Sequence, residues 1–150
     1  MSKINLLFIL LMTSLLSACG FHTPQHNTSL NAVVMANDNN TTALELVKRF
    51  DLNARQKFIV QVGDEVQKQQ TSSYTSANKV KSYTLSLTVP VKIYNANQQL
   101  QLSKDLTAKT HLSKMDNTQA DRLQINEGYE QLRNTIIKKL IRRLNRLNEN

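Results

Sequence analysis

The sequence has few of the residues from which catalytic and metal sites are usually built. It contains only three glycines, so no glycine-rich loop is present to hold a phosphate group. No Ser/His/Asp order occurs in the context of a catalytic triad, and no carboxylate pair shares a helix face with a base. His22 and His26 have the H-x₃-H spacing of metal ligands, but a metal site needs three or four ligands and no third lies nearby. We therefore predict neither catalytic residues nor a metal, and a lipid-anchored hydrolase is the weakest hypothesis.

Cysteine is equally scarce, because Cys19 is the only one. It ends the stretch Leu16-Ser17-Ala18-Cys19, which has the form of a lipobox: an apolar residue, two small residues and the cysteine. Lys3 and the apolar run Leu6–Met12 precede it, in the order of a secretory signal. Acylation of Cys19 leaves no thiol for a disulfide, a zinc–thiolate site or a nucleophile. The only cofactor we expect is this covalent lipid.

The hydrophobic run is too short to cross a membrane as a helix. Ile4 to Leu16 comprises 13 positions, whereas a spanning helix needs roughly 20 apolar residues. An uncleaved anchor with an incidental cysteine is therefore the weaker alternative. We predict a signal peptide over residues 1–18, a lipidated tether over 19–28 and a single domain over 29–150.

The expected location follows from the residue after the cysteine and from the net charge. Aspartate at that position tends to retain a bacterial lipoprotein in the inner membrane, so Gly20 favours the outer membrane. The formal charge is +8, and removal of Lys3 leaves 18 basic residues against 11 acidic ones, or +7. Such a charge favours anionic partners. At the periplasmic side of an outer membrane we expect a phosphorylated glycolipid and no nucleic acid.

The strongest periodic signal is strict alternation over residues 83–93, which predicts a long antiparallel strand with one buried face. The apolar side is Tyr83, Leu85, Leu87, Val89, Val91 and Ile93. Pro90 lacks an N–H, so it must lie at an unpaired edge or a bulge. After turn residues 95–97 a return strand is predicted, interrupted by Lys104. Its expected inner face is Leu100, Leu102, Leu106, Ala108 and Leu112.

Weaker patterns predict the rest of the sheet and a first helix. Alternation indicates strands over residues 30–36 and 58–62. Thr42 and the glutamate three residues later fit a capping box, which predicts a helix over 43–52 with Thr42 as the N-cap. The polar segment 67–78 predicts a mobile strand end or a hairpin.

The chain ends in a predicted amphipathic helix. Asp116-Asn117 can cap it, and apolar residues from Tyr129 to Leu147 recur at helical spacing, with basic residues on the opposite arc. Gly128 predicts a break, kink or late start, because glycine costs a helix about 1 kcal/mol relative to alanine. Arg133 falls within the apolar arc and must extend its charge to solvent. These elements predict an α+β two-layer sandwich, with a mixed, mostly antiparallel four-stranded sheet and two helices on one face.

Several segments, in their order along the chain, resemble the LPS-assembly lipoprotein family, LptE. They are Cys19-Gly20-Phe21-His22, Ser82–Val89, Leu106–Lys109 leading to Asp116-Asn117, and Leu140-Ile141-Arg142-Arg143-Leu144. The resemblance implies a lipoprotein that sits as a plug in the lumen of the outer-membrane β-barrel LptD and supports its assembly. It also implies binding of lipopolysaccharide and its delivery to the outer leaflet. The alternative is a generic periplasm-facing adaptor lipoprotein that binds another protein or peptidoglycan.

The candidate ligands for lipid A phosphates are basic residues beside the long strand and the Asp-Asn turn. They are Lys79, Lys81, Lys109, Lys114 and Arg122. Lysine and arginine suit phosphate through charge-assisted hydrogen bonds. The competing interpretation is that they are ordinary solubilising charges. We expect the basic arc of the last helix to be a solvated or barrel-facing surface.

Overall fold

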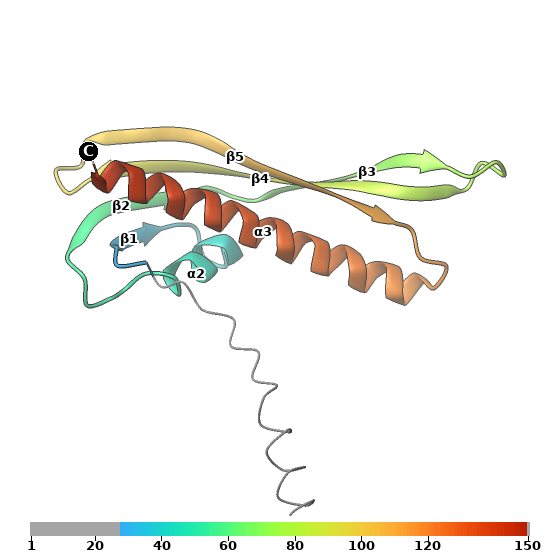
Figure 1. Cartoon of the computed structure of the whole chain (residues 1–150), viewed down its shortest axis with the longest axis horizontal. Coiled ribbons are helices and arrows are strands. Elements are labelled where there is room, and N and C mark those ends of the chain that lie inside the picture. Colours follow the sequence, from blue (N-terminus) through green and yellow to red (C-terminus); the bar gives the residue numbers. More distant parts are fainter. Residues whose placement is uncertain (1–27, 150) are drawn as a thin grey trace, which may run out of the picture.

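The computed structural model describes residues 28–149 and has an α+β fold with one sheet and two helices (Figure 1). Cys19, the predicted signal peptide and the H-x₃-H pair lie outside the described residues. The elements in chain order are β1 (Asn31–Met35), α2 (Thr41–Val47), β2 (Gln56–Val62), β3 (Val66–Tyr74), β4 (Val80–Asn95), β5 (Leu100–Ser113) and α3 (Thr118–Glu149). The predicted fold class is confirmed, except that the sheet has five strands and not four.

The long strand β4 is the centre of the sheet. Antiparallel β5 pairs along one edge of β4, and β2 and β3 follow one another along the other edge. β1 adds to β2 in parallel. α3 crosses the face formed by β4 and β5, and α2 lies against α3 and β1 (Figure 1). The predicted apolar row of β4 therefore packs under α3, and it is fully buried from Leu85 to Ile93.

Pro90 lies where the partner of β4 changes from β2 to β3. β2 pairs with β4 from Val91 onward, and β3 pairs with it up to Thr88. The Gly63 N–H donates to the Pro90 carbonyl at 2.8 Å, and the N–H that proline lacks would point into the same gap. The predicted edge position is wrong, because Pro90 pairs with Asp105 on the other side of β4, but its missing N–H falls in the gap between β2 and β3, where neither strand pairs with it. Gly63 permits the close approach, since a Cβ there would lie 3.1 Å from the Pro90 Cβ.

The fifth strand is β3, which comes from the polar segment predicted as a strand end or hairpin. The hairpin alternative is confirmed: β3 pairs antiparallel with β4 and a turn over residues 75–79 joins them. Its side chains are almost all exposed, so hydrophobic alternation could not reveal it. Backbone pairing holds it, aided by hydroxyl contacts such as Ser73 to Ser82 at 2.6 Å.

The cap of α2 was predicted at the wrong residue. Asn40 is the N-cap: its side-chain oxygen accepts from the Ala43 N–H at 2.9 Å, and its amide donates to the Gly63 carbonyl at 2.9 Å. Thr42 is fully buried inside the helix, where its hydroxyl has a different partner. The helix is also shorter than predicted: it ends at Val47, whereas the predicted helix extends to residue 52.

α3 runs without interruption from Thr118 to Glu149, so the predicted break at Gly128 is wrong. Asn117 caps it as expected, accepting from the Gln119 and Ala120 N–H groups at 2.9 and 3.1 Å. Gly128 is buried against the sheet, and a Cβ there would lie 2.8 Å from a Leu85 methyl carbon. The glycine thus serves close helix–sheet packing.

The inner face of β5 also differs from the prediction at one residue. Leu100 is 55% exposed, whereas Leu106 and Ala108 are buried. A register shift beside Ile93 places Leu100 opposite Tyr94. Because one extra residue reverses the alternation, Leu100 faces away from α3.

Candidate functional site

Three of the five predicted basic residues, Lys81, Lys114 and Arg122, lie around the turn from β5 into α3, and a fourth, Lys79, lies in the turn between β3 and β4. Lys81 and Lys114 are neighbours across β4 and β5, and the Lys114 N–H donates to the Lys81 carbonyl at 2.9 Å. Lys79 lies two residues before Lys81 in the turn after β3, and Arg122 lies in the first turns of α3. All four side chains are exposed. We call Lys79, Lys81, Lys114 and Arg122 the hairpin-end cluster.

Lys109 is separated from this cluster. It stands opposite Ser86 on the face of the sheet that is turned away from α3, which we call the open face. Lys68 of β3 flanks Ser86 from the other side, so two lysines share one row on this open face. Lys114 lies five positions after Lys109, just past the end of β5, which corresponds to a distance of about 16 Å. The two groups cannot contact one phosphate together.

Asp121 stabilises the turn between β5 and α3 and neutralises part of the positive charge of the hairpin-end cluster. Its carboxylate accepts from the Met115 N–H at 2.8 Å and from the Tyr83 hydroxyl at 3.2 Å. Lys114 Nζ lies 3.6 Å from the same carboxylate. The hydrogen bond from Met115, followed by the charge of Lys114, lowers the pKa of Asp121. Lys114 is therefore partly compensated.

A second ionic group joins Glu65 to Arg133, and the sequence did not predict it. Arg133 donates to the carboxylate through Nε at 2.8 Å and Nη2 at 2.9 Å. Thr42 donates to it through its N–H at 3.1 Å and its hydroxyl at 2.6 Å. Both charged side chains are only 13% exposed. The expectation that Arg133 reaches solvent is therefore wrong, because its charge is met inside the protein.

The electrostatics of Glu65 follow from these contacts. Burial alone raises its pKa, but hydrogen bonds from Arg133 and Thr42 and the charge of Arg133 outweigh burial and lower the pKa to about 2. The carboxylate stays ionised at neutral pH and ties together α2, α3 and the loop between β2 and β3. The position of Arg133 within the apolar arc of α3 indicates that its charge needs a partner in the fold, but it does not indicate which residue that partner is.

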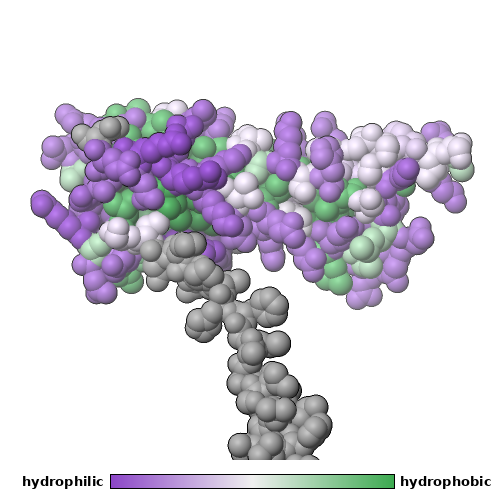
Figure 2. All heavy atoms as spheres, viewed as in Figure 1, coloured by the Kyte–Doolittle hydropathy of each residue, from purple (hydrophilic) through white to green (hydrophobic). Residues whose placement is uncertain are grey.

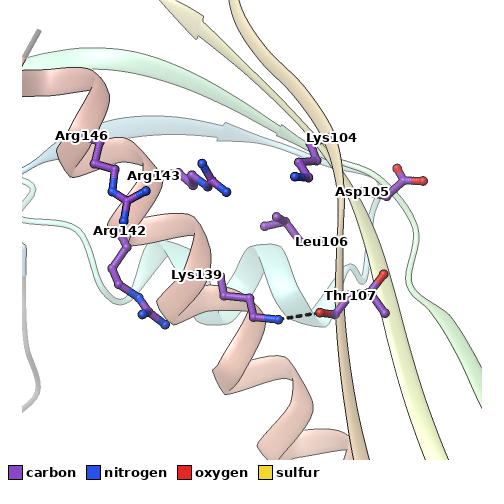
Figure 3. A pocket seen from close by; sticks show the side chains of 8 residues that line it. All are labelled: Lys104, Asp105, Leu106, Thr107, Lys139, Arg142, Arg143 and Arg146. Carbon is purple, nitrogen blue, oxygen red and sulfur yellow. Dashed lines mark hydrogen bonds between the residues drawn. The ribbon is translucent and has the colours of Figure 1, made fainter.

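A cleft between β5 and the C-terminal half of α3 gathers further cations. It has a volume of about 350 Å³ and is lined by Lys104, Asp105, Leu106, Thr107, Lys139, Arg142, Arg143 and Arg146 (Figure 3). Lys139 Nζ donates to the Thr107 carbonyl at 2.6 Å. Figure 2 shows the most hydrophilic side chains gathered over this part of α3, whereas the β3–β4 hairpin is pale. We call this the strand–helix cleft.

The strand–helix cleft could be predicted only in part. The basic arc of α3 is visible in the sequence, but Lys104 is evident there only as an interruption of the apolar row of β5. Within residues 28–149 no three His, Cys, Asp or Glu side chains meet as a metal site requires. In the same range no helix is both long and apolar enough to span a membrane.

Comparison with known families decides where the chain belongs. The sequence model of the family LptE, described as lipopolysaccharide-assembly, matches residues 29–146. The chain belongs to the LptE family. The match spans every described helix and strand but the end of α3, and thus includes both basic regions. A comparison with curated protein sequences finds no match.

Solved structures with the LptE-like fold agree with this membership. The crystal structure of rare lipoprotein B from Shewanella oneidensis is similar with a TM-score of 0.67 at 10% identity, covering 78% of this chain and 95% of that one. The solution structure of a lipoprotein B from Nitrosomonas europaea has a TM-score of 0.65 at 12% identity, covering 80% and 84%. A minor lipoprotein from Acinetobacter baumannii has a TM-score of 0.55 at 10% identity, covering 77% and 90%. At such identities the likeness shows the fold.

Proposed function

We propose that this LptE family member is a lipid-anchored subunit of the lipopolysaccharide transport machinery at the outer membrane. In this role it partners a large LptD-type β-barrel, as a plug and assembly subunit, and binds lipopolysaccharide. The family match over residues 29–146 carries the proposal. The similar proteins from S. oneidensis and A. baumannii are described as lipoproteins, which supports the anchor.

Cys19 is the proposed anchor, with residues 1–18 removed and 19–28 as the tether. Stable attachment to a bilayer needs more than one acyl chain, so mass spectrometry of the membrane-purified chain should show a mature N-terminus at Cys19 carrying several. Cys19→Ser should abolish the modification. A chain that keeps the first 18 residues and bears no lipid would contradict this part of the proposal.

The open face of the sheet suits a polar barrel lumen. It is formed by hydroxyl, lysine and histidine side chains: Thr84, Ser86, Thr88, Thr107, Lys109 and His111. Cross-strand contacts organise these groups, including Thr88 to Thr107 at 3.0 Å and Thr84 to His111 Nδ1 at 2.9 Å. We assign this face, with Lys109, to the barrel wall.

The barrel partnership is tested by purifying the chain from outer membranes under mild detergent. A stoichiometric complex with one large β-barrel is the expected result. A generic adaptor lipoprotein would instead co-purify with a different protein or with peptidoglycan, or would run alone. Either of those results would contradict the proposed role.

Lipopolysaccharide binding is assigned to the hairpin-end cluster, whose exposed cations can reach lipid A phosphates. Lys79→Gln with Lys81→Gln should weaken binding about fivefold, as expected when two exposed charge contacts are lost. Lys92→Gln with Lys138→Gln removes the same charge from exposed positions elsewhere and serves as the control. Equal binding by the two double variants would remove this assignment.

A further inference from the structure

Among residues 28–149, no carboxylate pairs with the excess of positive charge in the strand–helix cleft. Five cationic side chains line it, against the single carboxylate of Asp105. Asp105 stands opposite Pro90, on the other face of β5, and its side chain points away from the cleft (Figure 3). The ion pairs within residues 28–149 are Lys48–Glu45, Lys114–Asp121 and Arg133–Glu65. No cation of the cleft belongs to them.

Lys104 occupies a strand position at which an apolar side chain is expected. It stands opposite Val91, on the face of β5 that turns toward α3. From α3, Arg143 extends toward it across Leu106 (Figure 3). Two cations placed in this way repel each other, and an anion bound between them would turn that repulsion into attraction.

The rest of the cleft has the chemistry of a phosphate site. Arg142 and Arg146 lie one helical turn apart and so are neighbours on the surface of α3. Each guanidinium is a planar fork that can donate two hydrogen bonds to one phosphate. Lys139 closes one side, held by its bond to the Thr107 carbonyl at 2.6 Å. At about 350 Å³ the cleft has room for more than one such group.

We propose that the strand–helix cleft binds a group carrying two phosphates, at a site separate from the hairpin-end cluster. Three guanidinium and two ammonium groups offer more donors than one phosphate can accept. Leu106 and the alkyl stems of the arginines add an apolar floor, which favours a headgroup over a free ion. Assigning this group to a doubly phosphorylated glycolipid rests on the proposed function, whereas the phosphate chemistry does not.

The two basic regions cannot hold one headgroup between them. Arg122 and Arg143 are 21 positions apart on the single helix α3, which corresponds to about 30 Å. The cleft therefore binds its own glycolipid molecule, or the same molecule at a different stage of its transfer.

A competing explanation for Lys104 is protection of the β5 edge. Inward-pointing lysines on edge strands discourage pairing with a second chain. In that case Lys104→Gln would promote self-association and leave anion binding unchanged. The experiment below separates the two explanations.

The test uses the full chain in nonionic detergent, titrated with pyrophosphate at constant ionic strength. We expect saturable binding, tighter than for inorganic phosphate, with shifts of the Leu106 and Thr107 amide resonances. Lys104→Gln with Arg143→Gln should weaken pyrophosphate binding about tenfold, because charge-assisted hydrogen bonds are lost. The control variant, Lys92→Gln with Lys138→Gln, should weaken it by less than about twofold. The proposal would be overturned by equal weakening in both variants or by the absence of saturable binding. It would also be overturned by equal affinity for phosphate and pyrophosphate, or by self-association as the only effect of the cleft variant.

The glycolipid source is tested with vesicles that contain lipid A bearing either two phosphates or one. The native chain should prefer the doubly phosphorylated lipid, and the cleft double variant should lose that preference. One result would overturn the cleft assignment alone: glycolipid binding that is unchanged in the cleft variant but weakened by Lys79→Gln with Lys81→Gln. Pyrophosphate binding without any glycolipid binding would overturn the glycolipid source together with the lipopolysaccharide-binding part of the proposed function.

Discussion

The ion pair between Glu65 and Arg133 and the strand–helix cleft both use arginines of α3, with opposite charge balance. At the ion pair every charged group has a partner: the guanidinium meets the carboxylate, and Thr42 supplies two further donors. In the cleft, cations from α3 and β5 face one another without a carboxylate between them. The ion pair is 13% exposed on each side, whereas Lys104 and Arg143 are exposed.

This difference shows how burial decides the use of a charge. A charge taken out of water must be paired within the fold, because an unpaired one costs several kcal/mol. At the surface, solvent screens like charges, so an imbalance is tolerated and remains available to a ligand. The ion pair is therefore a structural element, and the cleft is a binding element.

The largest expected effect comes from breaking the ion pair. Glu65→Ala leaves the Arg133 guanidinium largely buried and without its carboxylate partner, and it removes the acceptor of Thr42. We expect the free energy of unfolding to fall by about 3 kcal/mol, at the lower end for a broken buried pair because some solvent reaches it. Urea denaturation measures this value.

The exposed pair of Lys48 and Glu45 is the matched control. Its two atoms lie 2.7 Å apart, but the side chains are 63% and 37% exposed. Glu45→Ala should therefore cost less than about 1 kcal/mol. Comparable losses in the two variants would mean that burial does not distinguish these pairs.

The next effect is a pH dependence that belongs to the same ion pair. The pKa of Glu65 is about 2, below the ordinary 4.5, so its stabilisation is complete above pH 4.5 and is lost as the pH falls through about 2. We expect the native chain to lose about 2 kcal/mol more than Glu65→Ala does between pH 5 and pH 2, after allowing for solvent screening. Urea titrations of both chains at several pH values measure the difference. Parallel curves would show that Glu65 is not the group responsible.

The smallest effect on stability is expected in the cleft. Lys104→Gln with Arg143→Gln should change the free energy of unfolding by less than about 0.5 kcal/mol, because both side chains are exposed and like-charged. Any change should be toward higher stability and should shrink as salt is added. Thermal unfolding at low and high salt measures it. A loss of more than about 1 kcal/mol would show that these cations hold the fold together.

The difference between prediction and structure is informative at the first helix. Thr42 and Glu45 satisfy a capping pattern, yet Asn40 caps the helix. Asn40 is favoured because its amide also reaches the Gly63 carbonyl, and Thr42 is turned inward to Glu65. Both partners lie 23 residues away, so a local pattern could not include them.

At Gly128 of α3, too, a local pattern could not include the long-range contacts. Helix propensity treats glycine as a weak point, and the prediction of a break followed from that alone. In the fold, a Cβ at this position would lie 2.8 Å from a methyl carbon of Leu85 and 3.1 Å from one of Leu112. Packing against the sheet outweighs the local cost.

The sequence by itself determined the alternating strand under α3, the amphipathic last helix, the α+β class and the resemblance to the LptE family. These depend on how side chains are oriented about their own backbone, which periodicity reports directly. Only the tertiary structure decided that Arg133 meets Glu65, 68 residues away, and that Lys104 faces Arg143. Such pairings depend on strand register and on the rotation of α3 over the sheet, and neither is encoded in a local pattern.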